Sequence, residues 1–212
     1  MNLKVLIPIL IGVVVAIGAS VVVLYVPSSQ PEIEDYEIDF TYSHINKIKK
    51  ILTAQGISMS TPTEISDRTV KQYCSYFDND NVQQTVEYCS TTALVDSEDV
   101  PLGNLNIGGS STDASMALAI IDVSPQVNSK SDKVIFVFQS MIDVLVCDCW
   151  EEQQPGGFES VAYWLGTAEE RYLESGKPTL TSKIDGLDGK QVILEITSVA
   201  EESYIWSLVV AK

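Results

Sequence analysis

The sequence has little of what most catalytic and nucleic-acid-binding sites need. It contains one histidine, His44, and only 13 lysine and arginine residues against 29 acidic residues. A Ser-His-Asp or Cys-His arrangement would have to use His44, and the nucleophile-elbow pattern G-x-S-x-G is absent. The excess of negative charge repels nucleic acid and excludes it as a partner. We therefore expect no catalytic residue and interpret the chain as a non-enzyme.

Paired carboxylates are present, but an acidic chain produces such pairs by chance. Asp143 with Asp148, and Glu151 with Glu152, could act as acid–base partners in principle. The glycine-rich loop at 108–112 has no lysine after it and precedes an expected strand, so it does not have the pattern of a phosphate-binding loop. The sequence thus predicts no cofactor.

Four cysteines are present, and no C-x-x-C motif. An even number in an oxidising compartment favours disulfides, so the candidates are Cys74, Cys89, Cys147 and Cys149, with three pairings open. On a helix, Cys147 and Cys149 would point to opposite sides and reach different partners. On a strand they would share a face, which suits a metal or a short-loop bridge between them.

The alternative interpretation of the Cys147-Asp148-Cys149 motif is a thiol-based redox centre or a soft-metal site for copper or zinc. The spacing of Cys74 and Cys89 fits no zinc knuckle or ribbon, and only His44 could add an imidazole. Our expectation is therefore disulfides and no metal.

The longest uncharged stretch runs from Val5 to Val26. About 20 apolar residues in a helix cross the hydrocarbon layer of a membrane, so we expect a single-pass transmembrane helix over residues 5–26. A cleaved signal peptide is the alternative, since Gly18 and Ser20 resemble a cleavage site. Its apolar region would be shorter, however, and here five more apolar residues follow Ser20.

Charge predicts the orientation of this signal-anchor. Lys4 is the only charged side chain ahead of it, so residues 1–4 should stay in the cytoplasm and the C-terminal part should be extracytoplasmic. The remainder of the chain then has 12 basic and 29 acidic residues and a net charge of −17. Residues 27–34, which contain Pro27 and Pro31, form an expected linker.

The rest of the chain has the pattern of an α+β domain with antiparallel strands and about four helices. We divide it into a first half, 35–124, and a second half, 125–212. Helical periodicity or capping residues predict helices at 43–56, 66–77, 133–150 and 158–174. Alternating or β-branched runs predict strands at 85–95, 102–107, 115–123, 179–184, 190–197 and 204–210.

The helix expected at 133–150 is apolar on all sides, which is typical of an element buried in the core. A second membrane span is the alternative. The run is short for a span and includes Gln139, Asp143 and Asp148, which are costly in lipid, so we reject this alternative.

The order of two helices and three strands occurs twice, and a weak sequence repeat follows it. Val95-Asp96-x-x-Asp99 and Leu105-x-Ile107 recur 89 positions later as Ile184-Asp185-x-x-Asp188 and Leu194-x-Ile196. Turns favour aspartate in any protein, so chance similarity is the competing explanation. If the unit is duplicated, a groove between the two halves would be the expected binding site.

Together these features predict a membrane-anchored extracytoplasmic binding or accessory subunit. Its expected partners are the lipid bilayer and another membrane or cell-envelope protein.

Overall fold

The computed structural model describes residues 41–66, 70, 86–123, 130–200 and 203–212. Residues 39–212 form one compact unit, separate from residues 1–38. The predicted transmembrane helix at 5–26, the linker and the helix expected at 66–77 lie largely or wholly outside the described residues. Among the residues that are described, no helix is both long and apolar enough to cross a membrane.

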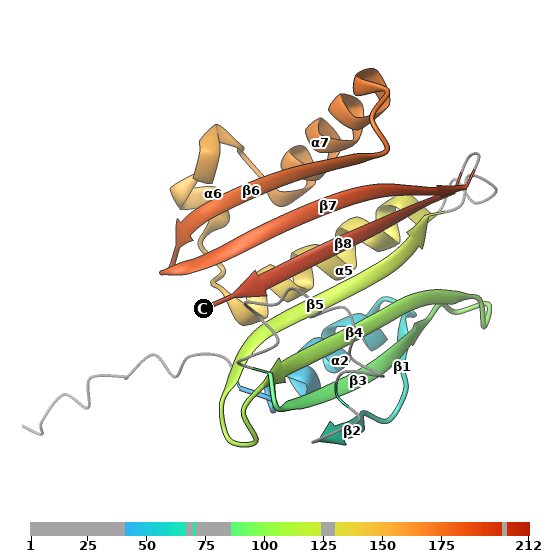
Figure 1. Ribbon diagram of the computed structural model, residues 1–212, viewed down its shortest axis with the longest axis vertical. Helices are drawn as coiled ribbons and strands as arrows, with labels where there is room; N and C mark the ends of the chain where they lie inside the picture. The colour runs from blue at the N-terminus through green and yellow to red at the C-terminus, as the bar shows by residue number, and fades with distance from the viewer. Residues whose placement is uncertain (1–40, 67–69, 71–85, 124–129, 201–202) are drawn as a thin grey trace, which may run out of the picture. The chain divides into compact units, whose positions relative to one another are not determined.

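The structure confirms the predicted α+β class with an antiparallel sheet. Within the described residues, eight strands form one sheet: β1 (Ser58–Met59), β2 (Thr63–Ser66), β3 (Tyr88–Val95), β4 (Pro101–Gly109), β5 (Ala114–Val123), β6 (Thr179–Leu187), β7 (Lys190–Ala200) and β8 (Ser203–Ala211). The order is β1-β3-β4-β5-β8-β7-β6, with β2 also paired to β3 (Figure 1). Two three-stranded meanders, β3-β4-β5 and β6-β7-β8, are therefore joined through their last strands.

The main helices pack on one face of this sheet. They are α2 (His44–Ala54), α5 (Lys130–Leu145) and α7 (Val161–Ser175), with the short α6 (Trp150–Gln153) and a 3-10 turn, η3 (Pro155–Gly157), between the last two. Figure 1 shows α5 behind the central strands β5 and β8, with α2 and α7 behind the two outer parts of the sheet. The buried central helix predicted from the all-apolar run therefore exists, as α5.

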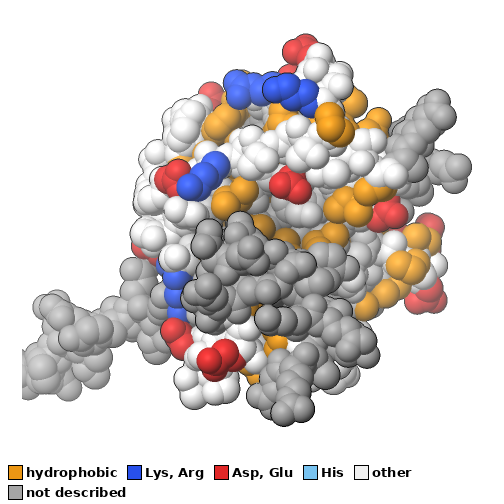
Figure 2. Space-filling model, in the orientation of Figure 1, with side chains coloured by type: hydrophobic (Ala, Val, Ile, Leu, Met, Phe, Trp, Pro, Cys, Tyr) orange, Lys and Arg blue, Asp and Glu red, His pale blue; other side chains and the backbone are white. Residues whose placement is uncertain are grey.

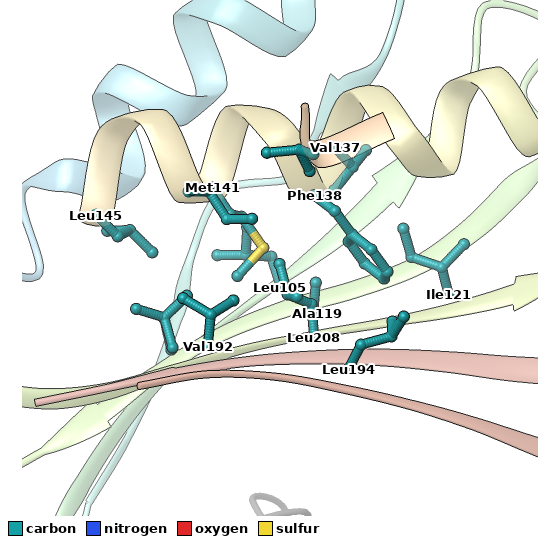
Figure 3. Close-up of a cluster of buried hydrophobic side chains, with 14 of the residues drawn as sticks. Leu105, Ala119, Ile121, Val137, Phe138, Met141, Leu145, Val192, Leu194 and Leu208 are labelled. Atoms are coloured by element: carbon teal, nitrogen blue, oxygen red, sulfur yellow. The ribbon is translucent and has the colours of Figure 1, made fainter. Parts of the chain in front are cut away.

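The core lies between α5 and the sheet. In the central strands, apolar side chains at alternate positions point toward the helices, and Val137, Phe138, Met141 and Leu145 of α5 pack against them. Figure 3 shows these four side chains above Leu105, Ala119, Ile121, Val192, Leu194 and Leu208 of four strands. All ten are at most 2% exposed. Dense packing on this face holds α5 in place from Val134 to Leu145.

The opposite face of the sheet carries a smaller apolar cluster of Val70, Val86, Cys89 and Leu118. Where Figure 2 colours the side chains on this face by type, hydrophobic ones are interspersed with polar and charged ones.

The prediction of one helix over 133–150 is wrong at both ends. The helix begins at Lys130, before the expected start at residue 133, and it ends at Leu145. Past that point the backbone N–H groups of Val146 and Cys147 both donate to the carbonyl of Ile142, at 2.8 and 3.1 Å. The second of these bonds spans five residues, so the chain leaves α-helical geometry before the two cysteines.

The remaining boundaries differ by a few residues. The helix expected at 158–174 begins at Val161, because Ser160 is its cap and accepts a hydrogen bond from the Tyr163 backbone N–H. The helix at 43–56 is present as α2, but Ser43 makes no side-chain capping bond. Neither β1 nor β2 was predicted from the sequence; both are short, and among the described residues they pair with β3 alone.

Candidate functional site

The two cysteines of the Cys147-Asp148-Cys149 motif are joined by a disulfide in the connection between α5 and α6. Their Cα atoms are 5.1 Å apart, an ordinary separation for a bridged pair. The connection is neither helix nor strand, so the side-chain directions expected for a helix or a strand do not apply here. Of the arrangements considered from the sequence, the short-loop bridge between the two cysteines is the one found. In this oxidised form neither sulfur is a free thiolate that could bind copper or zinc.

This disulfide adds little to stability through loop closure. It closes a loop of only three residues, for which the chain-entropy relation gives about 1.6 kcal/mol, compared with about 3 kcal/mol for a 15-residue loop. Cys89, by contrast, is fully buried and is also disulfide-bonded. Cys74 lies outside the described residues. Stabilisation of the fold is therefore a poor explanation for the 147–149 bridge.

Two hydrogen bonds hold the cysteine backbone in place independently of the bridge. The Cys147 N–H donates to the Ile142 carbonyl at 3.1 Å, and the Cys149 carbonyl accepts from the Gln153 N–H at 3.0 Å. The Gln153 side chain also donates from Nε2 to Cys149 Sγ at 3.1 Å. The bridge thus lies on a backbone that the helix ends already position.

Trp150, directly after the bridge, anchors this connection in the core. It is 3% exposed, and its indole Nε1 donates to the Phe158 carbonyl at 3.1 Å. Its ring lies 5.4 Å from the ring of Trp164 on α7, whose own Nε1 donates to Ser182 Oγ of β6 at 2.8 Å. The two tryptophans therefore connect the cysteine segment to α7 and the edge of the sheet.

A hollow of about 170 Å³ lies beside the bridge, between the end of α5, α6 and the start of α7. Four of its lining residues are acidic and none is basic; the lining consists of Gln139, Asp143, Asp148, Trp150, Glu151, Glu152, Ser160 and Val161. The two carboxylate pairs for which chance was the expected explanation, Asp143 with Asp148 and Glu151 with Glu152, thus line the same hollow. All lining residues belong to the second half of the chain, so this hollow is not a groove between the halves.

Asp143 is the most perturbed of these carboxyl groups. Burial, followed by the negative charges of Asp148 and Glu151, raises its pKa to about 6. A carboxyl group with a pKa near 6 can exchange a proton close to neutral pH. The sequence could not identify this property, because it arises from the closure of α6 and α7 over Asp143.

We expect Asp143→Asn to stabilise the protein at alkaline pH. The folded protein keeps the Asp143 proton up to about pH 6, whereas the reference pKa of the group is 3.8, so raising the pH between these values destabilises the native fold. The carboxyl group is only half-buried, and solvent screening limits the gain at pH 8 to about 1 kcal/mol. Near pH 4 and below, the difference should disappear.

Urea unfolding at pH 4 and pH 8 measures this difference. Asp122→Asn, which removes an exposed aspartate from β5, is the matched control and should leave the unfolding midpoint nearly unchanged at both pH values. A variant less stable than the parent at pH 8 would show that Asp143 is held in its charged form instead.

His44 is not among the residues that line this hollow; it is the first residue of α2. Its Nδ1 accepts a hydrogen bond from the Thr41 backbone N–H at 2.9 Å, and its Nε2 lies 3.4 Å from Lys47 Nζ. These contacts give it a local role at the start of the helix.

No family model matches the chain, and neither the curated proteins nor the solved structures gave a match. Its chemistry must therefore be argued from its own residues.

Proposed function

We propose that this protein is a single-pass membrane protein whose folded domain acts outside the cytoplasm as a binding or accessory subunit. The observation that carries the proposal is the uncharged stretch from Val5 to Val26, placed directly ahead of a compact unit. The asymmetry between Lys4 and the acidic residues after the stretch favours a cytoplasmic N-terminus.

The oxidised cysteines support an extracytoplasmic placement. Cys89, Cys147 and Cys149 are all disulfide-bonded, and disulfides persist in oxidising compartments. The net charge of −17 on the part of the chain after Val26, together with the acidic hollow, favours a partner with positive charge at its contact surface. Such a partner would be another membrane or cell-envelope protein, and nucleic acid is disfavoured by the same charge.

Membrane fractionation of the full-length chain tests this proposal. We expect the protein to stay in the pellet after an alkaline wash, to need detergent for extraction, and to lose its C-terminal part when protease is added to intact cells. Val14→Lys combined with Val15→Lys should release it, because two charges at the centre of a span cost about 5–7 kcal/mol on insertion scales.

The matched control is Val14→Leu combined with Val15→Leu, which should remain in the membrane. A full-length chain that is soluble without detergent would contradict the anchor. A protein that is extracted as a lone monomer under gentle conditions, with nothing cross-linked to it, would contradict the accessory role.

We also infer that the two meanders descend from one duplicated unit. The second and third strands of the meanders begin at the same spacing of 89 residues: β4 at Pro101 and β7 at Lys190, β5 at Ala114 and β8 at Ser203. The spacing of 89 residues seen in the sequence repeat therefore also holds for the starts of these strands in the structure.

Details of conformation and pairing support the same correspondence. Asp99 and Asp188, which are 89 positions apart, lie in the first hairpin turn of each meander, and both have positive φ, at 59° and 50°. In the pairing of β5 with β8, Ala119 faces Leu208, its own counterpart at this spacing. A local two-fold axis through that pair would relate the two meanders.

A further inference from the structure

We infer that the Cys147–Cys149 disulfide is redox-active and oxidises a pair of thiols on a partner peptide or protein. This inference goes beyond the binding role proposed above and does not depend on the membrane anchor. It rests on the position of the bridge, the contacts of its two sulfurs and the charge of the adjacent hollow.

The bridge is accessible, and the fold does not need it. Cys147 and Cys149 are each partly exposed, whereas the other described disulfide-bonded cysteine, Cys89, is fully buried. The backbone bonds of Cys147 to Ile142 and of Cys149 to Gln153 do not involve the sulfurs. The segment should therefore keep its shape after reduction, with the two thiols still close enough to be oxidised again.

The hydrogen bond from Gln153 Nε2 to Cys149 Sγ gives the bridge a direction. A thiolate of the partner attacks Cys147 Sγ, a mixed disulfide forms, and the sulfur–sulfur bond breaks with its electron pair on Cys149 Sγ. An N–H donor 3.1 Å from this sulfur stabilises the charge that develops there. Gln153 therefore acts directly on the leaving thiolate, by a hydrogen bond to its sulfur.

The second thiolate of the partner then attacks the partner's first sulfur, which is bonded to Cys147 in the mixed disulfide. This step forms the partner's disulfide and releases Cys147 as a thiolate. The partner has lost two electrons and gained a disulfide. Cys147 and Cys149 have gained the two electrons and take up the two protons that the partner thiols gave up. The only co-reactant is the partner dithiol, and the reaction balances without a further oxidant.

The charge of the site selects the partner. Asp148 lies between the two cysteines, and Asp143, Glu151 and Glu152 line the hollow beside them, with no basic side chain in the lining. This field repels a dithiol that is flanked by acidic residues and attracts one that is flanked by lysine or arginine. The substrate class is therefore a cationic peptide segment with two cysteines.

Anaerobic incubation of the full-length, detergent-solubilised protein with a reduced Cys-x-x-Cys peptide tests this inference. We expect one peptide disulfide per protein chain, and alkylation with mass measurement should place two new thiols at Cys147 and Cys149 while Cys89 stays bonded. A lysine-flanked peptide should react roughly tenfold faster than a glutamate-flanked one at low salt, and added salt should reduce the difference.

Two variants separate the proposed chemistry from simple exposure. Gln153→Ala should slow peptide oxidation several-fold without changing the circular dichroism spectrum, whereas Gln154→Ala, the neighbouring glutamine, should not. The double variant Cys147→Ser with Cys149→Ser should remain folded and oxidise no peptide. The inference is overturned if the native bridge leaves the peptide reduced, if Cys89 is reduced in parallel, or if the two peptides react equally fast.

Discussion

Trp164→Ala should lower the free energy of unfolding by about 3–5 kcal/mol, the largest loss that we expect from any single truncation near the site. Trp164 is fully buried on α7 and connects three parts of the fold: its ring contacts Trp150, and its indole nitrogen donates to Ser182 on β6. The truncation removes the ring, leaves a cavity and deprives the Ser182 hydroxyl of its donor.

Urea unfolding, followed by circular dichroism, measures the loss, and the melting temperature should fall by roughly 10 °C. Tyr163→Ala is the matched control, because it truncates the neighbouring aromatic residue on the same helix, which is 58% exposed. It should change stability by about 0.5 kcal/mol. Equal losses in the two variants would mean that α7 is not packed on the sheet through Trp164.

Gly103→Ala should destabilise the protein by about 3 kcal/mol, the upper end of what overpacking usually costs. Gly103 lies in β4, and a Cβ atom there would be 1.9 Å from the backbone carbonyl oxygen of Ile120 in β5. Backbone cannot move aside as a side chain can, so the two strands would have to separate at this point.

Gly166→Ala is the control with the opposite expected sign. This glycine lies inside α7, nothing is within 4 Å of the Cβ that alanine would add, and alanine is the better helix former by about 1 kcal/mol. Thermal unfolding of both variants should therefore show a loss for one and a gain for the other. A Gly103→Ala protein as stable as the parent would contradict the close approach of β4 and β5.

The sequence predicted much of the fold because strands and helices here bury one face each. The six strands of the two meanders were found because Leu105, Ile107, Leu194 and Ile196 follow the alternation that a half-buried sheet requires. The end of α5 was misplaced because apolar residues continue past Leu145, and periodicity does not register the extra hydrogen bond from Cys147 to Ile142.

The candidate site was less predictable than the fold. The sequence identified the Cys147-Asp148-Cys149 motif and the surrounding carboxylates, but disulfide pairing depends on backbone geometry that residue spacing leaves open. The hollow needs Ser160 and Val161 from the start of α7, and no local pattern places them beside Asp143. The carboxylate pairs were visible in the sequence, but only the fold shows that they line the same hollow.

The junction of β5 and β8 also bears on how the domain folds. Within each meander, paired strands are neighbours in the sequence, so their contacts close short loops. Pairing of Ala119 with Leu208 instead closes a loop of 89 residues, and such distant contacts are the slow ones to form. Each meander can therefore assemble early and locally, and the rate at which the domain is completed is governed by the meeting of these two strands beneath α5.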